Sequence, residues 1–151
     1  MNRIYPTRFA LRGRGFSLIE VLISVLILGL GLLGVAAMQA TALRNNQSAA
    51  ERSEATVLTY AMLDSMRANR DDANNGSYNL TSWTCTAPAT GTELFQKDLN
   101  RWITTVQANL GDTACGQINC GTTLCVIGVR WDDARGLGGA SAQEVFTRTR
   151  L

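Results

Sequence analysis

The longest run of apolar positions in the chain lies near its N-terminus. From Phe16 to Met38 the only ionisable side chain is that of Glu20. A helix over this run would be about 35 Å long at 1.5 Å per residue, which is enough to cross the hydrocarbon core of a bilayer. The pattern therefore predicts a transmembrane helix over residues 16–38.

After Met38 the apolar positions thin out but keep a helical spacing, and no proline interrupts them. These positions are Leu43, Ala50, Val57, Leu58, Ala61, Met62 and Met66. They predict that the helix continues over residues 39–70 as an amphipathic segment with these side chains on one face. The Asp, Asn and Gly cluster at residues 71–76 is expected to end it near Asn69.

The cluster at residues 71–76 partly resembles a calcium-binding loop. Such a loop needs an oxygen ligand where this chain has Ala73, and a closing glutamate where it has Ser82. A plain turn is the better interpretation.

Residues 71–151 are expected to form a globular region in which helix and strand patterns mix. Residues 77–91 read as a loop with at most a short strand. Residues 93–110 have apolar side chains at helical spacing, with Thr92 as the expected N-cap and Gly111 as the stop signal. The apolar positions are Phe95, Leu99, Trp102, Val106 and Leu110.

Two strands are predicted near the C-terminus. Residues 124–131 alternate in the way of a central strand, with Arg130 on the face opposite to the apolar one. That apolar face, expected to lie against the long helix, consists of Cys125, Ile127, Val129 and Trp131. A solvated turn containing Asp132, Asp133 and three glycines should follow, and then a return strand over residues 144–150. The fold class is thus α+β, a long helix packed on a small antiparallel sheet with a second helix.

Charge is distributed unevenly along the chain. Arg3, Arg8, Arg12 and Arg14 precede Gly15 with no acidic residue among them. Basic residues before a membrane span place residues 1–15 in the cytoplasm and residues 71–151 outside. Removing these four arginines would take the formal charge from +2 to −2. A mildly acidic chain gives no indication of nucleic-acid binding.

A cleaved secretory signal peptide is the competing interpretation of the N-terminus. Ala40-Thr41-Ala42 offers a site with small residues after an apolar run. Apolar cores of signal peptides are usually only about 7–15 residues long, however, and a carboxylate at Glu20 has no place in one.

The four cysteines all lie in the C-terminal half, at Cys85, Cys115, Cys120 and Cys125. In an exported domain an even number predicts two disulfides, for which three pairings are possible. We favour Cys115–Cys120 with Cys85–Cys125, which would close one short loop and tie the 77–91 region to the strand. A zinc site is disfavoured by the spacing and by the absence of histidine.

Enzymatic signatures are absent from the sequence. It has no histidine, no glycine-rich phosphate loop and no G-x-S-x-G motif. Asp132 and Asp133 are neighbours in a strand-like segment and would point in opposite directions. We expect no catalytic residue, no cofactor and no metal site.

The most specific signal is the segment from Arg14 to Glu20, RGFSLIE. A basic leader, a glycine, an aromatic residue and a glutamate that open a long apolar run resemble the class III signal of type IV prepilins. In that family a membrane-embedded prepilin peptidase cleaves after the glycine and methylates the new N-terminus. The resemblance implies cleavage between Gly15 and Phe16 and N-methylation of Phe16. Gly15 also suits cleavage physically, because it lacks a side chain and opposes helix formation.

Glu20 is the residue that most needs a partner. A carboxylate near bilayer depth costs about 2.5–3.5 kcal/mol on insertion scales. The resemblance implies that Glu20 pairs with the new ammonium group of Phe16 on a neighbouring subunit during assembly. Two other interpretations stay open: pairing with Phe16 four residues away on the same helix, and snorkelling to the membrane interface.

Residues 13–45 resemble in particular the PilV-type minor pilins. Their implied role is to prime the assembly of a type IV pilus, and the implied fold is the type IV pilin fold. Many major pilins have proline where this chain has Ala37, which counts against a role as the main building block. Gly29, Gly31 and Gly34 would allow close helix packing or local loosening of the helix.

The resemblance also implies partners and a location. The partners are prepilin peptidase, other pilin and minor pilin subunits, and the assembly platform of the inner membrane. The chain would span the inner membrane once and then reach the pilus at the cell surface. Two alternatives remain, a minor pseudopilin of a type II secretion system and an unprocessed single-pass anchored domain.

Overall fold

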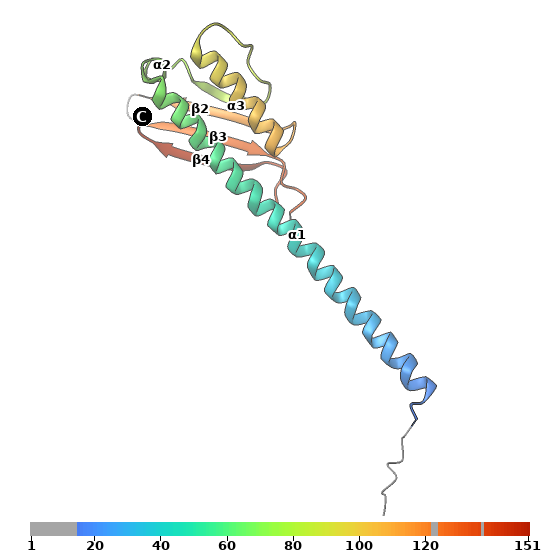
Figure 1. Ribbon diagram of the computed structural model, residues 1–151. Coiled ribbons are helices and arrows are strands. Elements are labelled where there is room, and N and C mark those ends of the chain that lie inside the picture. Colours follow the sequence, from blue (N-terminus) through green and yellow to red (C-terminus); the bar gives the residue numbers. More distant parts are fainter. Residues whose placement is uncertain (1–14, 122–123, 137) are drawn as a thin grey trace, which may run out of the picture. The chain divides into compact units, whose positions relative to one another are not determined.

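A computed structural model describes residues 15–121, 124–136 and 138–151. The predicted leader lies outside these ranges except for Gly15. The elements follow in the order α1 (Leu18–Ala68), α2 (Arg70–Asn74), β1 (Leu80–Thr84), α3 (Leu94–Leu110), β2 (Cys115–Cys120), β3 (Cys125–Trp131) and β4 (Gln143–Thr149) (Figure 1). Residues up to Gln39 and residues from Ala40 onward form two separate compact units.

The long helix predicted from the apolar run is confirmed. It ends at Ala68, one residue before the expected limit, because the chain turns there into the short helix α2. The breaker cluster therefore forms one further helical turn before the chain reverses at Gly76, whose φ of 79° suits glycine. By length and composition, α1 is able to cross a membrane.

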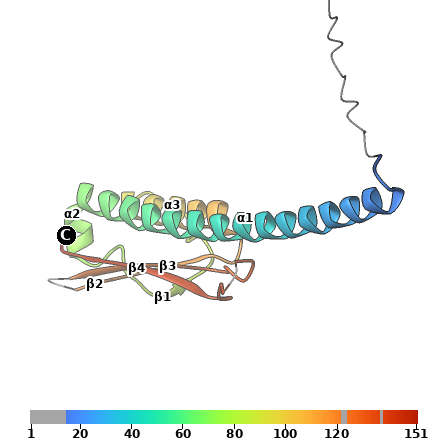
Figure 2. The ribbon, with the colours of Figure 1, turned by 90° about the horizontal axis from the view of Figure 1, so that it is seen from below.

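The second unit is a four-stranded antiparallel sheet with two helical segments on one face. The strand order is β1-β2-β3-β4, so each strand pairs with its neighbour in sequence. Residues 40–68 of α1 lie beside α3 over the same face of this sheet (Figure 2). The predicted α+β, type IV pilin-like fold is thereby confirmed.

The core of the second unit lies between this sheet and the two helices. α1 contributes Ala55, Leu58, Met62, Leu63 and Met66; α3 contributes Leu99, Trp102, Ile103, Val106 and Leu110; the sheet contributes Ile118, Cys125, Ile127, Val129 and Trp131. The indole Nε1 of Trp102 donates to the carbonyl oxygen of Leu58 at 2.9 Å, so no polar atom of this buried ring is left without a partner. The helix α3 comes close to β2 at Gly116, where a Cβ would lie 2.4 Å from the Trp102 ring.

The strand predictions near the C-terminus are confirmed. β3 is an interior strand whose predicted apolar face is buried, and β4 begins one residue before the expected start. β1 is the short strand expected within residues 77–91.

The sequence did not predict β2. Its only β-branched residue is Ile118, and the other positions are Cys, Gly, Gln and Asn, which are poor local signals for a strand. Pairing on both sides, with β1 and with β3, makes it a strand.

The face of α1 that packs on the sheet differs in part from the prediction. Leu58, Met62 and Met66 are buried as expected, whereas Leu43 and Val57 are 65% and 58% exposed. Ala50 and Ala61 are exposed as well. The predicted face combined two different apolar stripes of the same helix, and only the stripe that includes Ala55 and Leu63 meets the sheet.

The N-cap predicted for α3 is also corrected. The helix begins one residue later than Thr92 would place it, with Glu93 as the N-cap residue. The side chain of Gln96 accepts the backbone N–H of Glu93 at 3.3 Å, which is one half of a capping box. Gly111, with φ of 103°, ends the helix as predicted.

The favoured disulfide pairing is wrong. The bridges are Cys85–Cys115 and Cys120–Cys125. Cys115 and Cys120 are the two ends of β2, about 17 Å apart in an extended strand, which is too far for a bridge. Each bridge instead joins neighbouring strands: Cys120 lies opposite Cys125 in the β2–β3 register, and Cys85 follows Thr84, the partner of Gly116.

The interpretation of Asp132 and Asp133 as a solvated turn holds only for Asp132. Asp132 is exposed, whereas Asp133 is 2% exposed. Its carboxylate accepts a hydrogen bond from Ser48 of α1 at 2.6 Å. A sequence pattern could not show this contact, since the two residues are far apart along the chain.

Candidate functional site

The predicted cleavage site lies in an open, non-helical stretch of chain. Gly15, Phe16 and Ser17 precede α1. Phe16 is 82% exposed, and a Cβ placed on Gly15 would meet no other atom within 4 Å. Because the bond between Gly15 and Phe16 is not inside a helix, its backbone groups are free to be bound by a peptidase. The geometry suits cleavage, and cleavage itself stays a prediction.

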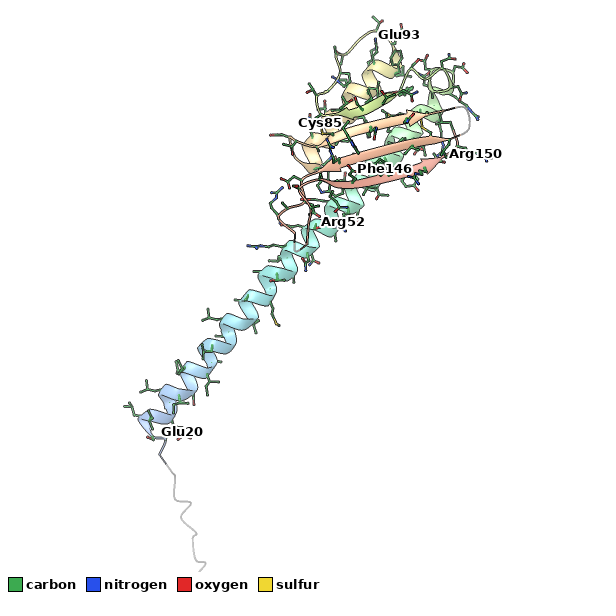
Figure 3. The ribbon with its side chains drawn as sticks, turned by 180° about the vertical axis from the view of Figure 1, so that it is seen from behind. Glu20, Arg52, Cys85, Glu93, Phe146 and Arg150 are labelled. Carbon is green, nitrogen blue, oxygen red and sulfur yellow. A yellow bond between two sulfur atoms is a disulfide. The ribbon has the colours of Figure 1, made fainter. Side chains whose placement is uncertain are left out.

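Glu20 lies in the first turn of α1 (Figure 3). The carbonyl oxygen of Ser17 accepts the backbone N–H groups of Glu20 at 3.0 Å and of Val21 at 3.3 Å. Since α1 starts at Leu18, Ser17 is at the N-cap position and Glu20 is the third helical residue. Ser-x-x-Glu is the spacing of a capping box, a signal that was present in the sequence and that our interpretation of Glu20 missed.

Glu20 is the acidic residue in the first turn of α1. A carboxylate in the first turn interacts favourably with the helix dipole. The side chain is exposed, and the ion pairs found among the described residues do not include it. Phe16 lies outside the helix, so the two residues are not neighbours on one helical face in the uncleaved chain.

The remainder of the first unit is an uncovered apolar helix. Its large apolar side chains are between 49% and 82% exposed, from Phe16 to Met38. The three glycines Gly29, Gly31 and Gly34 are equally bare, with nothing within 4 Å of an added Cβ. Contiguous apolar surface of this extent is typical of a segment that lies in a membrane or against another protein.

Three large apolar side chains are also exposed along the part of α1 that belongs to the second unit. Leu43, Val57 and Tyr60 are 65%, 58% and 53% exposed. They lie away from the stripe that packs on the sheet.

No metal-binding constellation is found in residues 15–121, 124–136 and 138–151. All four cysteines are engaged in disulfides, so no thiol is left to act as a nucleophile or a ligand.

Comparison with known proteins gives one match. Residues 11–36 match the family model described as the prokaryotic N-terminal methylation motif. Neither the curated proteins nor the solved structures gave a match. The matched stretch contains Gly15, Phe16 and Glu20 and ends within the apolar part of α1. An N-terminal methylation motif that leads into an uncovered apolar helix, in a chain with this α+β fold, indicates a type IV pilin-like protein.

Proposed function

We propose that the chain is a minor pilin that takes part in priming the assembly of a type IV pilus. The observation that carries the proposal is the methylation motif at residues 11–36, whose glycine lies in an accessible, non-helical segment. Prepilin peptidase would cut between Gly15 and Phe16 and methylate Phe16. The product would be a subunit whose function is structural rather than enzymatic.

The proposed assembly step pairs Glu20 with the ammonium group that cleavage creates on Phe16. The new ammonium group on Phe16 supplies a positive charge for the carboxylate of Glu20. Without such a partner, a carboxylate near bilayer depth costs about 2.5–3.5 kcal/mol on insertion scales. In the assembled filament this ammonium group would come from a neighbouring subunit. The uncovered apolar helix would pack against other subunits, with the inner-membrane platform as the place of assembly.

A role as a minor rather than a major subunit is supported by Ala37, which stands where many major pilins have proline. The location follows from the same processing and assembly steps. The chain would first span the inner membrane once and then reach the cell surface in the pilus. A minor pseudopilin of a type II secretion system would be processed in the same way, so the assay must separate the two.

The first experiment identifies the N-terminus of the mature chain. Mass spectrometry of protein from cells with prepilin peptidase is expected to show peptides that begin with N-methylated Phe16. Gly15→Val should abolish this processing, because a branched side chain then lies next to the cleaved bond. Gly13→Val is the matched control and should still be cut. An uncut Gly15 chain in the presence of the peptidase, or cleavage after Ala42, would refute the proposal.

The second experiment tests Glu20 without disturbing the start of α1. Glu20→Gln removes the charge but keeps a residue that serves in a capping box. We expect normal processing and a loss of roughly tenfold or more in the amount of this chain recovered with sheared filaments, since an unpaired ammonium group is costly in an apolar setting. Glu54→Gln, farther along α1, is the control and should be incorporated normally.

Deleting the chain separates the pilus from the secretion role. Loss of surface pili with normal secretion of extracellular enzymes is the expected phenotype. Normal surface pili with loss of secretion would instead indicate a minor pseudopilin of a type II secretion system.

A further inference from the structure

Three polar side chains on one face of α1 contact the last residue of β3 and the segment that connects β3 to β4. Ser48 Oγ donates to Asp133 Oδ2 at 2.6 Å, and Arg52 Nη2 approaches the same oxygen at 3.3 Å. Trp131 Nε1 donates to Glu51 Oε2 at 3.1 Å. We call Ser48, Glu51, Arg52, Trp131 and Asp133 the polar clasp. Figure 3 shows Arg52 where α1 passes this connection.

Asp133 is the centre of the polar clasp. It is 2% exposed, and its backbone is hydrogen-bonded within the connection, from its N–H to the carbonyl oxygen of Ala140 at 3.0 Å and from the N–H of Gly136 to its own carbonyl oxygen at 3.0 Å. A buried carboxylate that loses its donors is strongly unfavourable. The connection and α1 therefore stabilise each other through this one side chain.

The polar clasp continues the buried stripe of α1. Ser48, Glu51 and Arg52 are spaced like the apolar residues that follow them on the same face, Ala55 and Leu58. Before Ser48, every described residue of α1 is exposed. Among residues 15–47, the one side-chain hydrogen bond is internal to the helix, from Ser24 Oγ to the carbonyl oxygen of Glu20. Along α1, the polar clasp is thus the first anchor to another element.

Residues 40–47 lie between the apolar run and the polar clasp. This stretch of α1 contains Thr41, Asn45 and Asn46, which are weaker helix formers than alanine or leucine. A helical segment that lacks tertiary contacts is only marginally stable in water, and local opening concentrates in such segments. Opening that starts here would spread along the helix until it meets an interaction that opposes it.

We propose that the polar clasp is an end stop for local opening of α1. Opening that begins in residues 40–47 ends at Ser48, and Asp133 is the residue that stops it. The sheet and the core stay folded while the preceding part of the helix changes conformation. This inference goes beyond the proposed function, since it holds for the chain in a pilus, in a secretion apparatus or as a membrane anchor.

Hydrogen exchange of the full chain in detergent micelles, read by mass spectrometry, tests the end stop. Ser48→Ala removes a donor to Asp133 and leaves the apolar core intact. Helix propensity alone predicts slower exchange in this variant, because alanine is the better helix former. The end stop predicts the opposite, an exchange of the amides of residues 49–56 that is roughly tenfold faster, as expected for a lost hydrogen bond to a charged group.

Asp133→Asn is the second variant and should accelerate exchange in the same residues. Asp132→Asn is the matched control, since Asp132 is exposed and accepts a hydrogen bond from the backbone N–H of Ala134. The amides of residues 62–66 should exchange at the wild-type rate in all three variants. Unchanged or slower exchange in Ser48→Ala would overturn the proposal, and so would an equal acceleration over residues 49–56, residues 62–66 and β3.

Discussion

Removing the disulfide Cys85–Cys115 is expected to destabilise the chain more than removing Cys120–Cys125. The two bridges join cysteines that are 30 and 5 residues apart. In the chain-entropy treatment, the constraint on the unfolded chain contributes roughly 3.6 kcal/mol for the longer loop and roughly 2.1 kcal/mol for the shorter one at 25 °C. The double Cys→Ser variants should therefore differ by about 1.5 kcal/mol in the free energy of unfolding.

Urea unfolding of the full chain in detergent, followed by tryptophan fluorescence, measures this difference. Equal losses, or a larger loss for the Cys120 and Cys125 variant, would refute the assignment of the long loop to Cys85–Cys115. The pairing can also be read directly. In a Cys120→Ser chain the structure leaves the thiol of Cys125 free, so alkylation followed by peptide fragmentation should find the label on Cys125. A label on Cys115 would instead support the pairing favoured from the sequence.

Two further predictions concern the core of the second unit. Gly116→Ala should lower the free energy of unfolding by about 1–3 kcal/mol, because the new Cβ would lie 2.4 Å from the Trp102 ring. Gly34→Ala is the control and should not lower it, because the space around Gly34 is open. Equal urea midpoints for the two variants would contradict the close approach of α3 to β2. Burial, together with the hydrogen bond that Tyr78 donates to Asp98 at 2.8 Å, raises the pKa of Tyr78 from 10.0 to about 12. The neutral phenol is thus favoured in the folded state, so its contribution to stability is fully present below pH 10 and is lost as the pH rises toward 12. Absorbance at alkaline pH in a processed Tyr60→Phe chain should show this late titration, and a midpoint near 10 in the folded protein would contradict it.

Local patterns in the sequence were sufficient for the elements that carry strong periodicity. The apolar run from Phe16, its helical continuation and the stop near Asn69 follow from side-chain chemistry within a few residues, and α1 matches them. The alternation of residues 124–131 likewise identified β3, because one face of an interior strand is buried. The RGFSLIE segment is also local, since a peptidase recognises neighbouring residues, and it is where the family match lies.

Tertiary structure decided whatever depended on residues distant in sequence. β2 becomes a strand only through its two partners, and the disulfides follow the register of those partners rather than the spacing of the cysteines. The sheet selects which of two apolar stripes on α1 is buried, because periodicity gives the spacing of a face but not its partner. Asp133 reads as a turn residue in the sequence and becomes buried because α1 brings Ser48 to its carboxylate. A pattern along the chain records what each residue prefers, and only the packed fold determines which residues it meets.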